Sequence, residues 1–172
     1  MSEKQIYEAF MKWQEQSWYG LPESKYLLPL IKARYSVEEA EFLTGLPFRK
    51  TSIEELAELR STDTESLTLK LDEAASNGLV WKDEKNGKTR YGLNDLFFSI
   101  FRASFWPGSD SDQIKEIAPP ANAYVLGGAL ENFSKAENKA LRTLPIHKTI
   151  QPNTTIKPYE YIVKILDGFC CF

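Results

Sequence analysis

The most constraining feature of this sequence is a regular series of helix and turn signals between residues 51 and 93. Thr51 or Ser52 can cap a helix over residues 53–60, because a hydroxyl oxygen accepts a hydrogen bond from the first turn. A turn at residues 61–63 follows, and leucines at core spacing predict a second helix over Glu65–Asn77 that ends at Gly78. The expected buried faces comprise Ile53, Leu56, Ala57 and Leu59 in the first helix and Leu67, Leu71 and Ala74 or Ala75 in the second.

A β-hairpin is expected directly after the second helix. Residues 79–81 read as a strand, Asn86-Gly87 is a strong hairpin-turn signal, and residues 89–93 read as the return strand. The order helix, turn, helix and hairpin over residues 52–93 resembles a winged helix. The resemblance implies that residues 64–77 form the recognition helix and residues 82–90 the wing. An unrelated helical hairpin followed by a β-hairpin is the alternative.

The acidic side chains of the expected recognition helix argue against DNA binding, whereas the basic side chains of the expected wing favour it. Recognition helices normally present basic or amide side chains to base edges, whereas residues 61–78 hold one basic side chain against four acidic ones. The candidates for groove contacts are Ser66, Thr68 and Lys70. The candidates for phosphate contacts in the basic wing are Lys82, Lys85, Lys88 and Arg90, although lysines at hairpin tips are often only solvated. The whole chain has a net charge of −3 and therefore no global cationic field.

Helices are expected on both sides of this core. Apolar spacing predicts helices over Glu3–Gln16, with Ser2 as cap, over Ser24–Arg34, where Pro29 kinks the helix or delays its start, and over Val37–Leu43. After the hairpin, Asn94 is expected to cap an apolar segment over residues 96–106. The residues expected to share one core with the segment 97–105 are Leu56, Leu67, Leu71, Leu79, Val80 and Tyr91.

The apolar segment over residues 96–106 holds more aromatic side chains than a small helical core can cover. It is therefore expected to contact another polypeptide through Phe101 and Trp106, with Trp13 or Trp18 nearby. A homodimer is the simplest such contact.

The rest of the chain carries a second basic feature. A polar linker is expected at residues 109–112, a break at Pro119-Pro120, and helix over residues 122–144 with an interruption at Gly127-Gly128. Lys135, Lys139 and Arg142 are spaced four and three apart, which puts them on one face of a helix. They form either a solvated face or a docking site for an acidic partner.

Signals for catalysis and metal binding are weak. The chain has one histidine, His147, and no signature that makes a nearby serine or cysteine a nucleophile. Its two cysteines, Cys170 and Cys171, are adjacent and cannot complete a zinc site or a disulfide framework alone. The sequence therefore predicts no enzyme and no catalytic or metal-ligating residue.

A second resemblance extends toward the C-terminus. Residues 141–146 (LRTLPI), residues 157–160 (KPYE) and the apolar residues up to Leu166 resemble the segment before the cluster-binding part of ferredoxin-like iron–sulfur proteins of anaerobes. Those proteins carry an N-terminal winged-helix region, an R-T-L/I-P linker and a P-Y-E helix before a C-x-C-R motif. Here Cys170-Cys171 is followed only by Phe172, and a cubane cluster needs four ligands. The resemblance implies the front module of such a protein, with a [4Fe-4S] cluster only if a longer native chain supplies the missing cysteines.

Together these patterns predict a mainly α fold with a small antiparallel β-hairpin. A winged helix-turn-helix core at about residues 52–93 lies in a helical region, residues 1–108, and residues 109–172 form a helical and extended segment that leads toward an absent cluster domain. The expected function is non-enzymatic protein docking or regulation beside an iron–sulfur redox protein, and the alternative is a DNA-binding transcriptional regulator. No apolar run is long enough for a membrane span, and the first residues lack the order of a signal peptide, which favours the cytoplasm.

Overall fold

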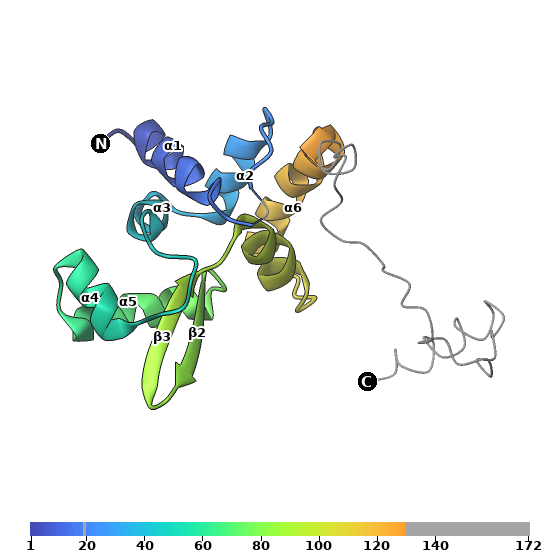
Figure 1. The fold of residues 1–172 in the computed structure, drawn as a ribbon. Helices are drawn as coiled ribbons and strands as arrows, with labels where there is room; N and C mark the ends of the chain where they lie inside the picture. The colour runs from blue at the N-terminus through green and yellow to red at the C-terminus, as the bar shows by residue number, and fades with distance from the viewer. Residues whose placement is uncertain (19, 130–172) are drawn as a thin grey trace, which may run out of the picture. The chain divides into compact units, whose positions relative to one another are not determined.

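The computed structural model describes residues 1–18 and 20–129 (Figure 1). This part of the chain is mainly helical and holds one small antiparallel sheet of three strands. The fold class expected from the sequence is therefore confirmed.

Three short helices come first. They are α1 (Glu3–Gln14), α2 (Leu27–Arg34) and α3 (Val37–Leu43). Ser2 and Ser36 each cap the following helix in a capping box, so the backbone amides of the first turns have side-chain partners. Helix α2 starts three residues later than Ser24, with Pro29 in its first turn, where a missing N–H costs no helical hydrogen bond.

The winged helix consists of β1 (Thr51–Ser52), α4 (Ile53–Arg60), α5 (Thr64–Ser76), β2 (Val80–Lys85) and β3 (Lys88–Leu93). The sheet order is β1-β3-β2, with β3 paired antiparallel to both neighbours. The hairpin lies in front of α5 in Figure 1. Strand β1 was not expected from the sequence, because two residues carry no strand signal of their own.

Backbone geometry at two turns matches the expected signals. Asn86 and Gly87 have φ of 55° and 70°, which is the left-handed pair of a tight hairpin turn. Gly78 has φ of 69° at the end of α5, and a Cβ built on it would lie 2.3 Å from the Cβ of Ala103. A glycine is therefore required at position 78 both by backbone conformation and by the close approach of the next helix.

That next helix is η1 (Phe98–Phe105), a π-helix. Its start corrects one expectation, because the carboxylate of Asp95, not the amide of Asn94, accepts the hydrogen bond from the backbone of Phe98, at 2.9 Å. Asn94 is buried and donates instead to the carbonyl of Gly78 at 2.8 Å. The Nδ2 group of Asn94 thus binds the residue that follows Asn77 at the end of α5, while its Oδ1, the atom that would accept a capping hydrogen bond, has no partner among the described residues.

Helix α6 (Asp112–Tyr124) corrects a second expectation, since it runs through Pro119 and Pro120 without a break and continues into η2 (Val125–Ala129). Prolines remove helical hydrogen bonds, so burial must compensate for them. Ile117, Ala121 and Tyr124 of α6 are buried, and the helix packs against α2. The tertiary contact thus maintains a helix that its sequence disfavours.

One hydrophobic cluster extends through the described residues. It contains Leu56, Leu67, Leu71, Leu79, Val80 and Tyr91 together with Ile100 of η1, as expected, and also residues of α1, α2, α3 and α6. Leu59 is the exception, because its side chain is 67% exposed and does not belong to the buried face of α4. Arg34 donates to the carbonyls of Ser99 and Asn77 and so links α2 to the winged helix.

Candidate functional site

The outward face of α5 carries the three residues expected to reach a DNA groove, Ser66, Thr68 and Lys70. The Thr68 hydroxyl is used within the helix, where it donates to the carbonyl of Thr64 at 2.6 Å. The Lys70 ammonium lies 5.8 Å from the centre of the Phe42 ring on α3. Ser66 is exposed. Two of the three side chains are thus occupied by contacts within the chain.

A stripe of two carboxylates and a leucine lies on the same helix. Glu65, Leu69 and Glu73 are spaced four residues apart, so they line one side of α5. All three are exposed, and Leu69 has 69% of its surface open to solvent. Within residues 1–18 and 20–129, neither carboxylate forms an ion pair. The stripe is therefore an acidic surface with an apolar side chain at its centre.

A shallow groove of about 360 Å³ lies between the N-terminal parts of α4 and α5. We call it the α4–α5 groove. Its lining residues are Ile53, Glu54, Thr64, Glu65, Thr68 and Leu69. It combines apolar surface from one isoleucine and one leucine with a carboxylate from each helix.

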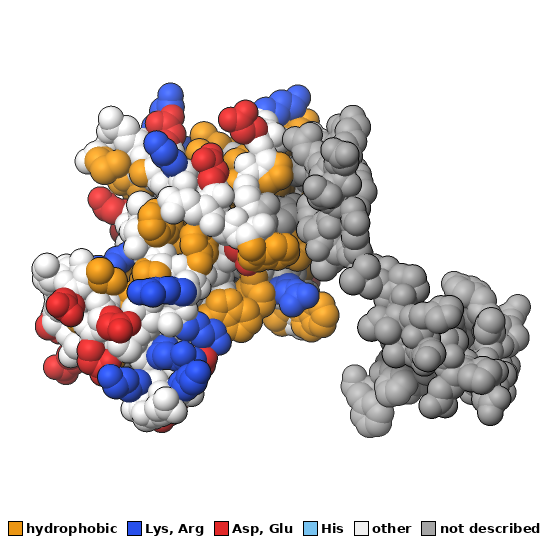
Figure 2. All heavy atoms as spheres, in the orientation of Figure 1, with side chains coloured by type: hydrophobic (Ala, Val, Ile, Leu, Met, Phe, Trp, Pro, Cys, Tyr) orange, Lys and Arg blue, Asp and Glu red, His pale blue; other side chains and the backbone are white. Residues whose placement is uncertain are grey.

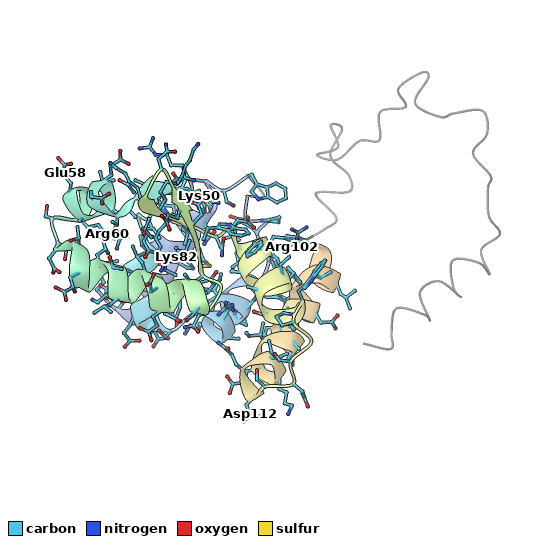
Figure 3. The ribbon with its side chains drawn as sticks, turned by 90° about the horizontal axis from the view of Figure 1, so that it is seen from below. Lys50, Glu58, Arg60, Lys82, Arg102 and Asp112 are labelled. Carbon is cyan, nitrogen blue, oxygen red and sulfur yellow. The ribbon has the colours of Figure 1, made fainter. Side chains whose placement is uncertain are left out.

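The charge around this groove is almost entirely negative. Residues 53–73 hold seven acidic side chains and two basic ones, Arg60 and Lys70. Arg60 turns inward and donates to the carbonyls of Phe42 and Thr44, at 2.6 and 3.1 Å, and burial lowers its pKa. Figure 3 shows Arg60 directed inward and Glu58 directed away from the helix pair. Acidic side chains accordingly gather over α4 in Figure 2, whereas basic ones gather over the hairpin.

On the wing, Lys82 is paired within the chain. Its Nζ lies 2.7 Å from Oδ1 of Asp72 on α5, and the Tyr91 hydroxyl donates to the same carboxylate oxygen at 2.6 Å. The hydrogen bonds from Lys82 and then from Tyr91 hold the pKa of Asp72 below its ordinary value. Desolvation, together with the hydrogen bond to Asp72, raises the pKa of Tyr91. This triad joins α5 to the sheet.

Arg90 is also paired within the chain. It donates two hydrogen bonds to the Asp83 carboxylate, at 2.9 and 2.8 Å, and Lys50 approaches the same carboxylate at 2.8 Å. The hydrogen bonds from Arg90 and Lys50 hold the pKa of Asp83 below its ordinary value. Lys50 also lies 5.6 Å from the centre of the Trp81 ring. Two of the four predicted wing cations are therefore neutralised by carboxylates of the same module.

Lys85 and Lys88 are the other two predicted wing cations. They face each other in the register of β2 and β3, next to the hairpin turn, and both are exposed. Neither forms an ion pair with a residue in the described part of the chain. The hairpin cations that are available to an anionic ligand thus lie at its tip. Val80, at the opposite end of β2, is about five residues away along the strand.

The two aromatic residues expected at a partner interface have different surroundings. Phe101 is partly buried, and its ring centre lies 5.2 Å from that of Phe97 and 6.4 Å from that of Phe105. Trp106 is 82% exposed, with the Arg102 guanidinium 5.9 Å from its ring centre. Trp106 is therefore the better candidate for a surface contact, whereas Phe101 is partly buried and packs against the hydrophobic cluster.

Several predicted residues lie outside the described residues, namely Lys135, Lys139 and Arg142 of the second basic feature. Of the six residues that line the α4–α5 groove, sequence reasoning predicted only Thr68 as a contact residue and missed the others, among them Glu54 and Leu69. A signal for Leu69 was present, because it lies two residues from both Leu67 and Leu71 and so cannot share their buried face. The position of Glu54 beside α5 depends on how the two helices pack, which no local pattern encodes.

Within residues 1–18 and 20–129, no group of three or more histidine, cysteine or acidic side chains is arranged to hold a metal ion. No helix in this part of the chain is both long and apolar enough to cross a membrane. Comparison of the chain with protein-family models, curated proteins and solved structures gave no match.

Proposed function

We propose that this winged helix is a non-enzymatic module that docks a protein partner through the outward surface of α5 and the adjoining α4. The observation that carries the proposal is the acidic stripe of Glu65, Leu69 and Glu73, which stands where a DNA-reading helix presents basic or amide side chains. A phosphate backbone would be repelled by these carboxylates, whereas an exposed leucine within a charged surface is typical of a protein contact.

The resemblance to the front module of ferredoxin-like proteins supports a partner from an iron–sulfur redox system. A cytoplasmic location stays a prediction from the sequence. The partner is either a separate iron–sulfur protein or a cluster-binding part in a longer form of this chain. No cofactor is assigned to the residues of this chain. Self-association through Trp106 is a further prediction, because that indole, directly after η1, is 82% exposed.

A DNA-binding regulator is the second candidate, and the observation that favours it is the exposed pair Lys85 and Lys88 at the wing tip. Each phosphate contact contributes a slope of about −0.9 to the dependence of log affinity on log salt. Two contacts therefore give a slope near −2, with weak affinity. A slope of about −4 or steeper requires more cations than these two lysines supply.

The experiment has two arms on the full chain. The first measures binding to random duplex DNA at low salt and its salt dependence, and we expect weak binding with a slope no steeper than about −2. In the second, a photo-crosslinking amino acid replaces Ser66, which is exposed on α5, and the protein is irradiated in extract of its source cells. We expect a protein adduct that is lost when Leu69→Asp is added.

The matched control has the crosslinker at Gln113, which is exposed on α6 and distant in sequence from the docking surface. An adduct that forms equally from Ser66 and Gln113 would count against docking through α5. Steep salt dependence together with nucleic-acid adducts from Ser66 would replace the proposal with the DNA-binding alternative.

A further inference from the structure

We infer that the α4–α5 groove takes a basic segment of the partner, in which a bulky apolar side chain is flanked by lysine or arginine. This inference rests on the proposed function and adds the chemistry of the ligand. It follows from three properties of the groove, which are its apolar surface, its unpaired carboxylates and the shortage of local cations.

The apolar surface supplies the anchor position. Leu69 is 69% exposed, and with Ile53 it gives the groove of about 360 Å³ its apolar lining. That volume is enough for one or two large aliphatic side chains and too small for a helix in its entirety. When an apolar side chain of the partner covers Leu69, its surface and that of Leu69 are both removed from water. This burial of apolar surface is the main favourable contribution to the binding free energy of such a contact.

The carboxylates define the charge of the segment. Glu54 and Glu65 line the groove from α4 and α5, and neither forms an ion pair within the described ranges, 1–18 and 20–129. Glu58 and Glu73 extend the negative surface along both helices and are likewise exposed. Carboxylates that have no partner in the free protein are available to lysine or arginine from outside, with arginine able to bind in bidentate fashion.

The nearby cations of the chain do not compete for this role. Arg60 is held by the carbonyls of Phe42 and Thr44, and Lys70 lies over the Phe42 ring. The wing cations Lys82 and Arg90 are paired with Asp72 and Asp83. The negative surface over α4 in Figure 2 is therefore not neutralised from within the module. An acidic segment or a nucleic-acid strand would meet the same carboxylates with repulsion.

The test selects ligands from a display library of random short peptides on the full-length protein, with removal of peptides that also bind the Leu69→Asp variant. We expect the selected peptides to be enriched in lysine and arginine next to a large apolar residue. A synthetic selected peptide should lose about tenfold in affinity with Leu69→Ala, which corresponds to roughly 1.4 kcal/mol. The double variant Glu54→Gln/Glu65→Gln should weaken it roughly threefold to tenfold at low salt, and less at high salt.

Matched control variants exist in this chain. Leu126 on η2 is 77% exposed, so Leu126→Ala removes a comparable side chain outside the groove. Glu116 on α6 is an exposed carboxylate, and Glu116→Gln removes one charge there. Both controls should leave the affinity unchanged within about twofold. Circular dichroism checks that each variant keeps its helix content.

Three results would overturn the inference. They are selection of acidic or uncharged peptides, binding that Leu69→Ala leaves unchanged, and direct binding of duplex DNA to the protein, measured without peptide, that Leu69→Asp abolishes. The first result, combined with a protein adduct from the crosslinker at Ser66, would refute the basic chemistry of the ligand while leaving docking through α5 intact. Loss of that adduct as well would refute both the basic chemistry of the ligand and docking through α5.

Discussion

Replacement of Leu71 by alanine tests the assignment of the two faces of α5. Leu71 is fully buried in the core cluster, and the change removes three carbon atoms from that core. At about 0.8 kcal/mol for each buried methylene, the transfer contribution is about 2.4 kcal/mol. The cavity left behind adds to this value, so the expected loss of unfolding free energy is about 2–5 kcal/mol.

The same helix offers an internal control, because Leu69 lies two residues away and is 69% exposed. Leu69→Ala should change the unfolding free energy by less than about 0.5 kcal/mol, since surface changes usually fall in this range. Urea unfolding of the full chain, followed by far-UV circular dichroism, gives both values from the midpoint and the slope. The face assignment is refuted if Leu71→Ala costs less than about 0.5 kcal/mol or if both variants cost the same.

Three further predictions concern other parts of the module. Gly87→Ala should lower the unfolding free energy by about 1–2 kcal/mol because of the positive φ alone. Gly78→Ala should lower it more, because the added Cβ would also meet Ala103. Equal urea midpoints for the two variants would contradict this prediction. The pKa of Asp72 is lowered in the folded protein, so its pairing with Lys82 stabilises the fold above about pH 4. This contribution is lost as the pH falls through the folded pKa. The difference in urea midpoint between wild type and Asp72→Asn should therefore shrink in acid. Trp106→Asp should lower the mass of concentrated protein measured by light scattering to that of a monomer without loss of helix content, and a monomeric wild type would exclude self-association.

The elements that the sequence predicted well are those that depend on a few neighbouring residues. The Asn86-Gly87 turn needs only two residues that tolerate positive φ, and the cap of α1 needs only a hydroxyl at Ser2. The core side of α5 follows from the spacing of Leu67 and Leu71. Each of these signals is strong because its energy is local and belongs to one segment.

Other elements depended on partners that are distant in sequence. Strand β1 exists because Thr51 finds Tyr91 of β3 beside it, and two residues form no strand without such a partner. Helix α6 continues through Pro119 and Pro120 while its buried side chains pack against α2. Asn94 was expected to cap a helix, but its side chain donates to the Gly78 carbonyl, and Asp95 accepts the capping hydrogen bond instead.

The candidate site divides in the same way. The sequence alone determined that α5 is acidic and that the β2–β3 hairpin is basic, because the net charge of a segment needs no coordinates. Tertiary structure decided which charges remain available, since Lys82 meets Asp72, Arg90 meets Asp83, and Glu54 and Glu65 meet no cation among the described residues. The physical reason is the sequence distance over which each interaction acts. Caps and turns are stabilised by residues within one or two turns of backbone, whereas ion pairs and grooves depend on how whole helices and strands pack.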